Sequence, residues 1–514
     1  MSRNEPDAAL AHREAPVVTT EYGRVAGVYS GGVAAFKGIP YAAPPVGRLR
    51  WRSPRPPESW DGALDASRYG AIAPQPRAAI SGDQPPVTSE DCLTLNVFAP
   101  PAAGDDLPVM VWIHGGAYYL GSSADPMFDG TGLAGRGNVV VVTLNYRIGA
   151  LGYLDFSSFA TSDEPFESNL GQRDQLAALE WVQRNIRVFG GDPTCVTVFG
   201  ESAGGGAITT LMTTPRAADL FCGAIVESAP AGSVYSRERA RGFAERFLGI
   251  VDVSAKNIGR LRSLPVETLT DACETLVQSN PLSSPGTIAV APVVDGDLVP
   301  DYPLDAFQRG TALRVPMLIG TNRHEAQLFK LMRSPILPTT ARGIDAMVEN
   351  LGLQAAQAIP RAYRRYPSRA AALHISTDAA FRMPSIWAAA AHSGYAPTWM
   401  YEFDYVPPVL KALGLGAVHG SELPYVWGNK PGNPLAAVPL GGTKWAAQIA
   451  DRMQSRWLEF AHTHEPNPAG VEPFWPRYDT QSRSTLMINR TDRIVDDPGY
   501  TQRRVWGDEV IAFR

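Results

Sequence analysis

Continuous apolar runs recur along the chain and are separated by longer segments with helical spacing. Short runs of aliphatic and aromatic residues without polar alternation are typical of strands that are buried on both faces of a sheet. The runs are Leu95–Phe98, Val109–Ile113, Val139–Leu144, Val196–Gly200, Ala224–Val226, Pro316–Gly320 and Thr398–Phe403. Because strands of this kind alternate with helical stretches, the pattern predicts an α/β fold whose central, mostly parallel sheet is covered by helices on both faces.

Other segments have different periodicities. Between residues 170 and 186 apolar side chains recur at three- and four-residue spacing, which predicts an amphipathic helix. Residues 17–41 carry short apolar runs punctuated by glycines and are predicted to form antiparallel strands near a sheet edge. The proline-rich passages at 40–57 and 71–89 cannot be helical, so we expect either ordered loop or, for 71–89, a mobile flap.

The domain organisation follows from these elements. Residues 1–16 mix charges and lack an apolar stretch, so we expect a disordered start without a secretory signal. Residues 17–514 contain no repeat or low-complexity linker and are predicted to form one domain. Two mainly helical insertions, roughly 233–284 and 329–395, are expected to form a cap.

Composition narrows the possible partners. The formal net charge of −5 argues against nucleic acid and anionic membrane surfaces, and no run of about 18 apolar residues occurs that would span a membrane. The four cysteines include no C-x-x-C pair and have no histidine beside them, so neither a metal site nor a cofactor is predicted. A reduced, cytoplasmic protein fits this pattern.

A single Gly-x-Ser-x-Gly motif offers a candidate nucleophile. Ser202 follows the apolar run 196–200 directly and precedes a helix-like segment, which is the order strand, tight turn, helix. Gly200 and Gly204 leave room around a serine in a strained turn. The alternative is an ordinary strand-to-helix turn.

A glycine loop after another predicted strand could bind an oxyanion. His114–Ala117 follows an apolar run, and a glycine pair there frees backbone N–H groups to point into a cleft. The N–H groups of Gly116, Ala117 and Ala203 are the candidate donors to a tetrahedral intermediate. The alternative is a plain glycine turn. His114 is expected to hold the loop by a hydrogen bond rather than to take part in catalysis.

A serine hydroxyl needs a base and an orienting acid. Among the eight histidines, His419 stands in a glycine-rich loop late in the chain, and Glu325 follows the end of a predicted buried strand. The order Ser202, Glu325, His419 is that of nucleophile, acid and histidine in α/β-hydrolases. His324 is a rival base, but its adjacency to Glu325 directs its side chain elsewhere if Glu325 faces the site.

Several further motifs follow one another along almost the whole chain. They are Phe36–Ala42, Pro44–Gly47, Ser89–Leu93, Asn145–Gly152, Asn169–Gly171, Asp174–Gln175, Phe189–Pro193, Phe199–Gly205 and Pro292–Gly296, with the loops His114–Ala117 and His419–Gly420. With these motifs the sequence resembles the type B carboxylesterases, a family that includes bacterial para-nitrobenzyl esterases, animal carboxylesterases and cholinesterases. The resemblance implies the α/β-hydrolase fold and hydrolysis of carboxylic esters of small to medium size through an acyl-enzyme.

The resemblance also assigns roles. It implies that Ser202 is the nucleophile, Glu325 the acid and His419 the base. The oxyanion donors that it implies are the backbone N–H groups of Gly116, Ala117 and Ala203. Two ion pairs matching the family, Arg50 with Glu90 and Arg147 with Asp174, are expected to be structural.

Residues beside these motifs are candidates for supporting roles. Glu201 is expected either to be structural, with a hydrogen bond to Ser228, or to contribute modest electrostatics. Four candidate pocket residues flank the motifs and could equally be plain core: Tyr118, Tyr119, Leu328 and Phe329.

Departures from the family pattern are informative. Cys92 matches a cysteine that is disulfide-bonded to an upstream partner in secreted members, yet no cysteine precedes it, which favours a cytoplasmic protein. The segment between Tyr69 and Glu90 has no aromatic residue, whereas cholinesterases place a tryptophan there, so a choline ester is not the expected substrate.

Three questions stay open at this level. An amidase or a carbamate hydrolase would use the same residues, because fold and triad do not fix the leaving group. A non-catalytic adhesion or scaffold protein on this fold would lack the nucleophile or the base, and this chain retains both. The expected partner is a small-molecule ester, and the chain could be a monomer or a homodimer.

Overall fold

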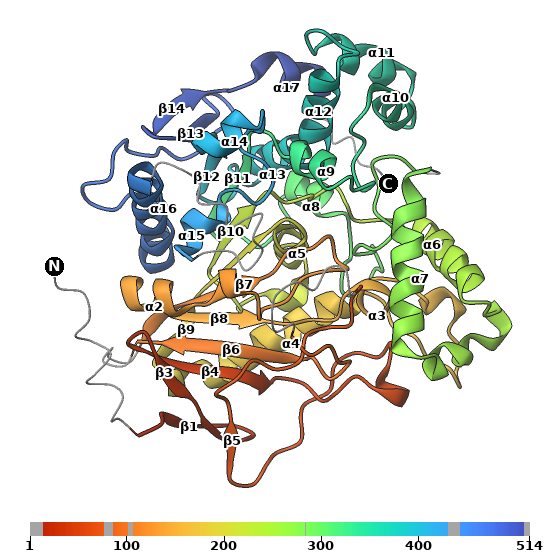
Figure 1. Ribbon diagram of the computed structural model, residues 1–514, viewed down its shortest axis with the longest axis vertical. Coiled ribbons are helices and arrows are strands. Elements are labelled where there is room, and N and C mark those ends of the chain that lie inside the picture. The colour runs from red at the N-terminus through yellow and green to blue at the C-terminus, as the bar shows by residue number, and fades with distance from the viewer. Residues whose placement is uncertain (1–13, 77–85, 101–105, 283, 430–442, 508–514) are drawn as a thin grey trace.

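An eleven-stranded sheet crosses the molecule in the order β14-β13-β12-β11-β10-β9-β7-β8-β6-β4-β3 (Figure 1). The computed structural model describes residues 14–76, 86–100, 106–282, 284–429 and 443–507. The strands are β3 Val28–Ser30, β4 Val33–Pro40, β6 Thr94–Ala99, β7 Leu107–Ile113, β8 Val140–Leu144, β9 Gly191–Glu201, β10 Gly223–Glu227, β11 Met317–Asn322, β12 Thr398–Phe403, β13 Ser484–Ile488 and β14 Arg493–Asp496.

Pairing is parallel throughout the centre of this sheet, from β8 through β7, β9, β10, β11 and β12 to β13. It is antiparallel at both margins, where β6, β4 and β3 follow β8 and where β14 pairs with β13. A small separate sheet contains β1 Val17–Thr20, β2 Gly23–Ala26 and β5 Ala63–Asp65. The predicted α/β architecture is confirmed.

Both faces of the sheet are buried because successive side chains of a strand point to opposite sides. In β7, Val109 and Val111 join the cluster containing α4 (Leu170–Asn185) and α5 (Ala203–Leu211). Met110 and Trp112 join a second cluster, which contains α2 (Thr131–Gly137), α15 (Leu423–Trp427) and α16 (Thr443–Thr463). This explains the continuous apolar runs of the sequence.

The predicted strands and the 170–186 helix are confirmed, with small differences. The antiparallel strands expected in residues 17–41 are β1 to β4. One short 3-10 turn, Gly47–Leu49, interrupts the first proline-rich passage, which otherwise has no helix. The sequence did not identify β13 and β14, so β12 is not the last strand. The expected disorder of residues 1–16 and the expected flap at 71–89 fall largely on residues 1–13 and 77–85, outside the described residues.

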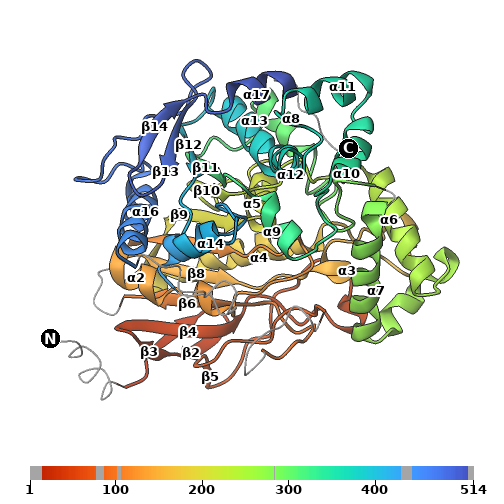
Figure 2. The same cartoon turned by 45° about the horizontal axis from the view of Figure 1, so that its top comes forward.

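Helices fill the two insertions. The first contains α6 (Arg237–Ile250) and α7 (Val266–Ser279). The second begins within α9 Ala326–Leu331 and contains α10 Ala341–Glu349, α11 Leu353–Arg361, α12 Arg369–Thr377, the π-helical turn Asp378–Arg382 and α13 Met383–His392. In both overall views α6, α7 and α10 lie on one side of the molecule and α16 on the other (Figures 1 and 2).

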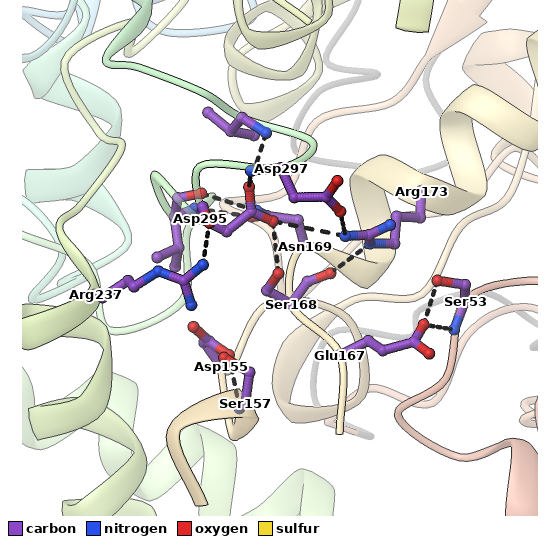
Figure 3. A network of polar contacts seen from close by, with 12 residues as sticks. Ser53, Asp155, Ser157, Glu167, Ser168, Asn169, Arg173, Arg237, Asp295 and Asp297 are labelled. Atoms are coloured by element: carbon purple, nitrogen blue, oxygen red, sulfur yellow. Dashed lines mark hydrogen bonds and ion pairs between the residues drawn. The ribbon is translucent and has the colours of Figure 1, made fainter. Parts of the chain in front are cut away.

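A polar network anchors the start of α6 to the body of the fold (Figure 3). Arg237 donates to the backbone carbonyl of Asp295. The Asp295 carboxylate accepts hydrogen bonds from Ser168 Oγ at 2.6 Å and Asn169 Nδ2 at 2.8 Å, just before α4. These two donors satisfy Oδ2, and the backbone N–H groups of Asp297 and Val299 satisfy Oδ1. Because the buried Asp295 is held in this way, the first insertion has a fixed attachment beside α4.

Both predicted ion pairs form. Arg147 binds Asp174 through two nitrogens, at 2.7 and 2.6 Å, and both side chains are buried. Arg50 makes a similar two-nitrogen contact with Glu90. The remaining helices are α3 Gly149–Gly152, α8 Pro303–Arg309, α14 Pro408–Ala412 and α17 Tyr500–Trp506. Among the described helices, none has both the length and the apolar character needed to cross a membrane.

Candidate active site

The carboxyl ends of the parallel strands bring the candidate residues to one edge of the sheet. β7 ends at Ile113, immediately before the His114–Ala117 loop, and β9 ends immediately before Ser202. Glu325 follows β11, and His419 lies in the loop between α14 and α15, after β12. Since these strands run parallel, residues far apart in sequence converge at this edge.

Ser202 occupies a strained turn between β9 and α5. Its φ of 57° and ψ of −124° fall outside the regions that side-chain-bearing residues normally adopt. A β-carbon at Gly204 would overlap the carbonyl of Ile113, and one at Gly200 would lie 2.6 Å from the same oxygen. The two glycines are therefore required by close packing against the end of β7, a constraint from a distant strand in addition to the strained turn that the sequence predicted.

His419 connects Ser202 to Glu325. Its Nε2 lies 2.8 Å from Ser202 Oγ and its Nδ1 lies 2.7 Å from Glu325 Oε2. The second oxygen of Glu325 accepts hydrogen bonds from the Asn322 backbone N–H at 2.6 Å and from Ser228 Oγ at 2.7 Å. Glu325 is fully buried, and both of its carboxylate oxygens accept hydrogen bonds. It can therefore hold the imidazole in one orientation and stabilise its cation.

The expected hydrogen bond between Glu201 and Ser228 is wrong. Ser228 donates to Glu325, whereas Glu201 Oε1 lies 3.2 Å from His419 Nε2, on the side of the ring that faces Ser202. The reason is that Glu325 takes the hydrogen bond of Ser228, while Glu201 and Ser202 both lie against Nε2 of the same imidazole. Burial raises the pKa of Glu201 to about 7, against the lowering effect of His419.

Two carboxylates therefore act on one imidazole. Burial by itself lowers the pKa of His419, but Glu201 and Glu325 together raise the pKa to about 9. Because Glu201 and His419 each shift the pKa of the other, their protonation states are linked.

Glu201→Gln is expected to move the acidic limb of the kcat/KM profile to lower pH, by about one unit. Removing an anion beside the imidazolium destabilises the charged form and lowers the pKa of His419, so the neutral base persists in more acidic solution. The measurement is the pH dependence of kcat/KM for p-nitrophenyl acetate. An unchanged limb, or a shift to higher pH, would contradict the electrostatic role of Glu201.

The glycine loop after β7 lies directly against the nucleophile. A β-carbon at Gly115 would lie 3.0 Å from the Ser202 β-carbon, and Gly116 and Ala117 have positive φ angles of 115° and 52°. The N–H groups of Gly116, Ala117 and Ala203 make no hydrogen bond to another residue that the structure describes. They are therefore available to an oxygen bound beside Ser202.

A cavity of about 210 Å³ opens over Ser202 and His419. Its walls include the four residues predicted for the pocket, Tyr118, Tyr119, Leu328 and Phe329. The remaining walls are mainly apolar, which favours a substrate with hydrocarbon or aromatic groups on either side of the reacting carbonyl.

Sequence reasoning missed Phe381. It lies in the π-helical turn between α12 and α13 and lines the cavity. Its ring centroid is 4.6 Å from that of His419, and Phe329 contacts the same imidazole at 5.2 Å. Turns of this type are frequent at functional sites, but no local residue pattern marks this one.

Glu422 was also missed. It is fully buried, accepts a hydrogen bond from Asn322 Nδ2, and lies 3.4 Å from Ser228 Oγ. Burial raises its pKa well above the usual range, and the neighbouring Glu201 and Glu325 raise it further. The sequence feature that could have indicated Glu422 is its position in the same loop as His419, three residues later.

The other histidines near these motifs lie outside the triad. His114 is buried, with Nδ1 2.8 Å from the Gly115 carbonyl oxygen, as predicted for a loop-holding residue. His324 packs against Gly416 and makes no recorded contact with Ser202. Among the described residues, the one cluster of side chains close enough to hold a metal ion is Cys195, Cys222 and His464, which does not line the cavity.

Comparison with known proteins agrees with this geometry. The profile of the carboxylesterase family matches residues 14–506. Para-nitrobenzyl esterase of Bacillus subtilis is 41% identical over 95% of this chain and 98% of its own length. Fumonisin B1 esterase of Sphingopyxis macrogoltabida is 36% identical over 92% of this chain and 86% of its own length.

Solved structures give the same result. A para-nitrobenzyl esterase structure superposes with a TM-score of 0.85 at 40% identity, covering 96% of this chain and 99% of that chain. The carboxylesterase EST55 of Geobacillus stearothermophilus has a TM-score of 0.83 at 35% identity, with coverages of 95% and 99%. The chain therefore belongs to the carboxylesterase family and is a serine carboxylic ester hydrolase of the α/β-hydrolase fold.

Proposed function

We propose that Ser202, His419 and Glu325 form the catalytic triad of this esterase. The observation that carries the proposal is the continuous hydrogen-bonded chain from Ser202 Oγ through the His419 ring to Glu325. In this role, His419 Nε2 takes the proton of Ser202 as Oγ attacks the ester carbonyl. Glu325 orients the ring and stabilises the imidazolium.

The oxyanion is stabilised by the N–H groups of Gly116, Ala117 and Ala203. Each preorganised donor of this kind lowers the barrier by about 3 kcal/mol. As the tetrahedral intermediate collapses, His419 gives its proton to the leaving alcohol and an acyl-Ser202 ester remains. His419 then activates a water molecule, and a second tetrahedral intermediate releases the acid and regenerates Ser202.

The substrate class that we propose is a carboxylic ester of small to medium size. The support is the mainly apolar cavity of about 210 Å³, which accommodates an acyl and an alcohol group of modest size. An ester with an aromatic alcohol is consistent with the para-nitrobenzyl esterase name of the Bacillus subtilis relative. An amide or a carbamate reacting at the same triad is the second candidate.

Steady-state rates on an ester, an amide and a carbamate that share acyl and aryl groups test this assignment. We expect kcat/KM to be highest for the ester, because an alcohol is a better leaving group than an amine, while the oxyanion donors serve any acyl group. A higher kcat/KM for the amide or the carbamate would reassign the substrate class without altering the triad.

We further propose that the helices of segments 233–284 and 329–395 form a cap over the site within a single domain of residues 17–514. In support, the cavity walls include Gly232 and Gly286, at the borders of the first segment, and Met332, Leu337 and Phe381 of the second. The last helix of the second segment, α13, packs against the sheet beside β11 and β12.

We propose a cytoplasmic location. The four cysteines are free in the structure, and Cys92 has no disulfide partner. A thiol titration of the unfolded protein, purified without reductant and denatured with a chelator, is expected to find four free thiols per chain. Fewer than four would indicate oxidation and contradict a reducing compartment.

A further inference from the structure

Two cysteines and a histidine meet at the edge of the sheet opposite to Ser202. Cys195 lies near the start of β9, Cys222 immediately precedes β10, and His464 immediately follows α16. Ser202 follows Cys195 by seven positions, a rise of roughly 23 Å along an extended strand. This cluster is therefore separate from the esterase site.

The fold fixes this meeting. β9 and β10 pair in parallel with Thr197 opposite Gly223, which places the two cysteines on neighbouring strands. Along β9 the side chain of Cys195 points to the same face as that of Phe199, and this face is covered by α16. His464 has a left-handed φ of 59°, where α16 ends above the two strands.

The ligand-type atoms are close together. Cys222 Sγ lies 3.2 Å from His464 Nε2, and the two sulfurs and this nitrogen all lie within 4.8 Å of one another. Gly223 makes room for the imidazole, since a β-carbon there would lie 3.1 Å from His464 Cδ2. Tetrahedral coordination of zinc by sulfur at 2.3 Å and nitrogen at about 2.0 Å requires ligand separations of roughly 3.5 to 3.8 Å. Shifts of a fraction of an ångström to about one ångström would satisfy this geometry.

We propose that Cys195, Cys222 and His464 bind one Zn²⁺ ion per chain. Two thiolates and one imidazole form a ligand set suited to zinc rather than to magnesium or calcium, which prefer oxygen. All three residues are partly exposed, so a water molecule can complete the tetrahedron. Binding forms two Zn–S bonds and one Zn–N bond, and the thiol protons pass to solvent.

The two cysteines lie close enough to shift each other's pKa values. The hydrogen bond from the Cys222 thiol lowers the pKa of Cys195, and that interaction correspondingly raises the pKa of Cys222. Burial lowers the pKa of His464, so the ring is neutral at neutral pH.

Bound zinc would tie the end of α16 to β9 and β10. The two thiols make only weak hydrogen bonds to the described backbone. Cys195 Sγ lies 3.5 Å from the Ala461 carbonyl oxygen, and Cys222 Sγ lies 3.3 Å from the Val196 carbonyl oxygen. Replacing them with three coordinate bonds would stabilise the folded chain in proportion to the affinity for the ion. The expected role is structural, remote from ester hydrolysis.

The test is a Co²⁺ titration of the reduced, chelator-treated full chain, followed by displacement with Zn²⁺. We expect a thiolate-to-cobalt charge-transfer band that saturates at one ion per chain and disappears as zinc is added. Zinc should also raise Tm by several degrees. The Cys195→Ser/Cys222→Ser variant should lose the band, and His464→Asn should weaken binding by at least about tenfold.

Cys273→Ala is the matched control, because it removes a buried thiol far along the chain from the cluster and should keep both the band and the Tm shift. Hydrolysis of p-nitrophenyl acetate reports whether each variant is folded. A second experiment needs no variant: the protein without substitutions is alkylated, and the modified cysteines are mapped by mass spectrometry. Bound zinc should slow the alkylation of Cys195 and Cys222.

Several results would overturn the proposal. These are the absence of a one-to-one band in the reduced chain, a band that survives loss of both cysteines, and alkylation rates at Cys195 and Cys222 that zinc leaves unchanged. Isolation of a Cys195–Cys222 disulfide whose reduced form takes up no cobalt would also reject the metal site.

Discussion

Replacement of Ser202 by alanine is expected to lower kcat for p-nitrophenyl acetate by about 10⁶-fold, to the limit of detection. The variant lacks the oxygen that forms the acyl-enzyme, while His419, Glu325 and the oxyanion loop remain in place. The side chain of Ser202 makes its one recorded hydrogen bond, among described residues, to His419, so its loss should not disturb the fold. The measurement is steady-state hydrolysis, with circular dichroism and Tm compared with those of the parent chain.

Ser334→Ala is a matched control for this variant. Ser334 lines the same cavity but is not hydrogen-bonded to His419, so its loss should leave kcat within about threefold of the parent value. Substantial turnover by a folded, freshly purified Ser202→Ala protein would show that another group attacks the ester and would remove Ser202 from the mechanism.

His419→Gln is expected to reduce kcat nearly as much as Ser202→Ala. Residues that act as a unit have non-additive effects, so the variant combining both changes should be hardly slower than either alone. Glutamine keeps a hydrogen-bonding group near Ser202 and Glu325 but cannot accept the serine proton. Steady-state kinetics on the two single variants and the double variant provide the measurement.

His324→Gln is the control that separates the two rival bases. His324 precedes Glu325 directly, yet its ring packs against Gly416 and not against Ser202. Its replacement should therefore change kcat by less than about tenfold. If His324→Gln were inactive and His419→Gln active, the assignment of the base would be reversed.

The sequence alone determined the architecture and the identity of the chemical groups. Runs such as Val109–Ile113 are apolar at every position because both faces of the sheet are covered. Such a run is contained in a few consecutive residues, so it can be recognised in the sequence. The motif around Ser202 is local too, because the apolar run, Gly-x-Ser-x-Gly and the helix-like segment follow one another directly, although Gly200 and Gly204 also make room for Ile113 of a distant strand. Chain order then linked the serine to an acid and a histidine.

Contacts between distant segments were decided only by the tertiary structure. The sequence could propose a partner for Glu201 but selected the wrong one, because the choice between Ser228 and His419 depends on how β9, β10 and the 414–423 loop converge. Phe381 reaches the imidazole through a π-helical turn that carries no local signature.

The cluster of Cys195, Cys222 and His464 is the clearest example of a site that only the tertiary structure reveals. No sequence spacing indicates a ligand set when Cys222 and His464 are 242 positions apart. Strand register and the end point of α16 bring them together. Hydrophobic periodicity and the residue preferences of turns depend on a few neighbouring residues, so the sequence reveals them. The contact partners of a side chain depend on how distant segments pack, and that is determined by the whole fold.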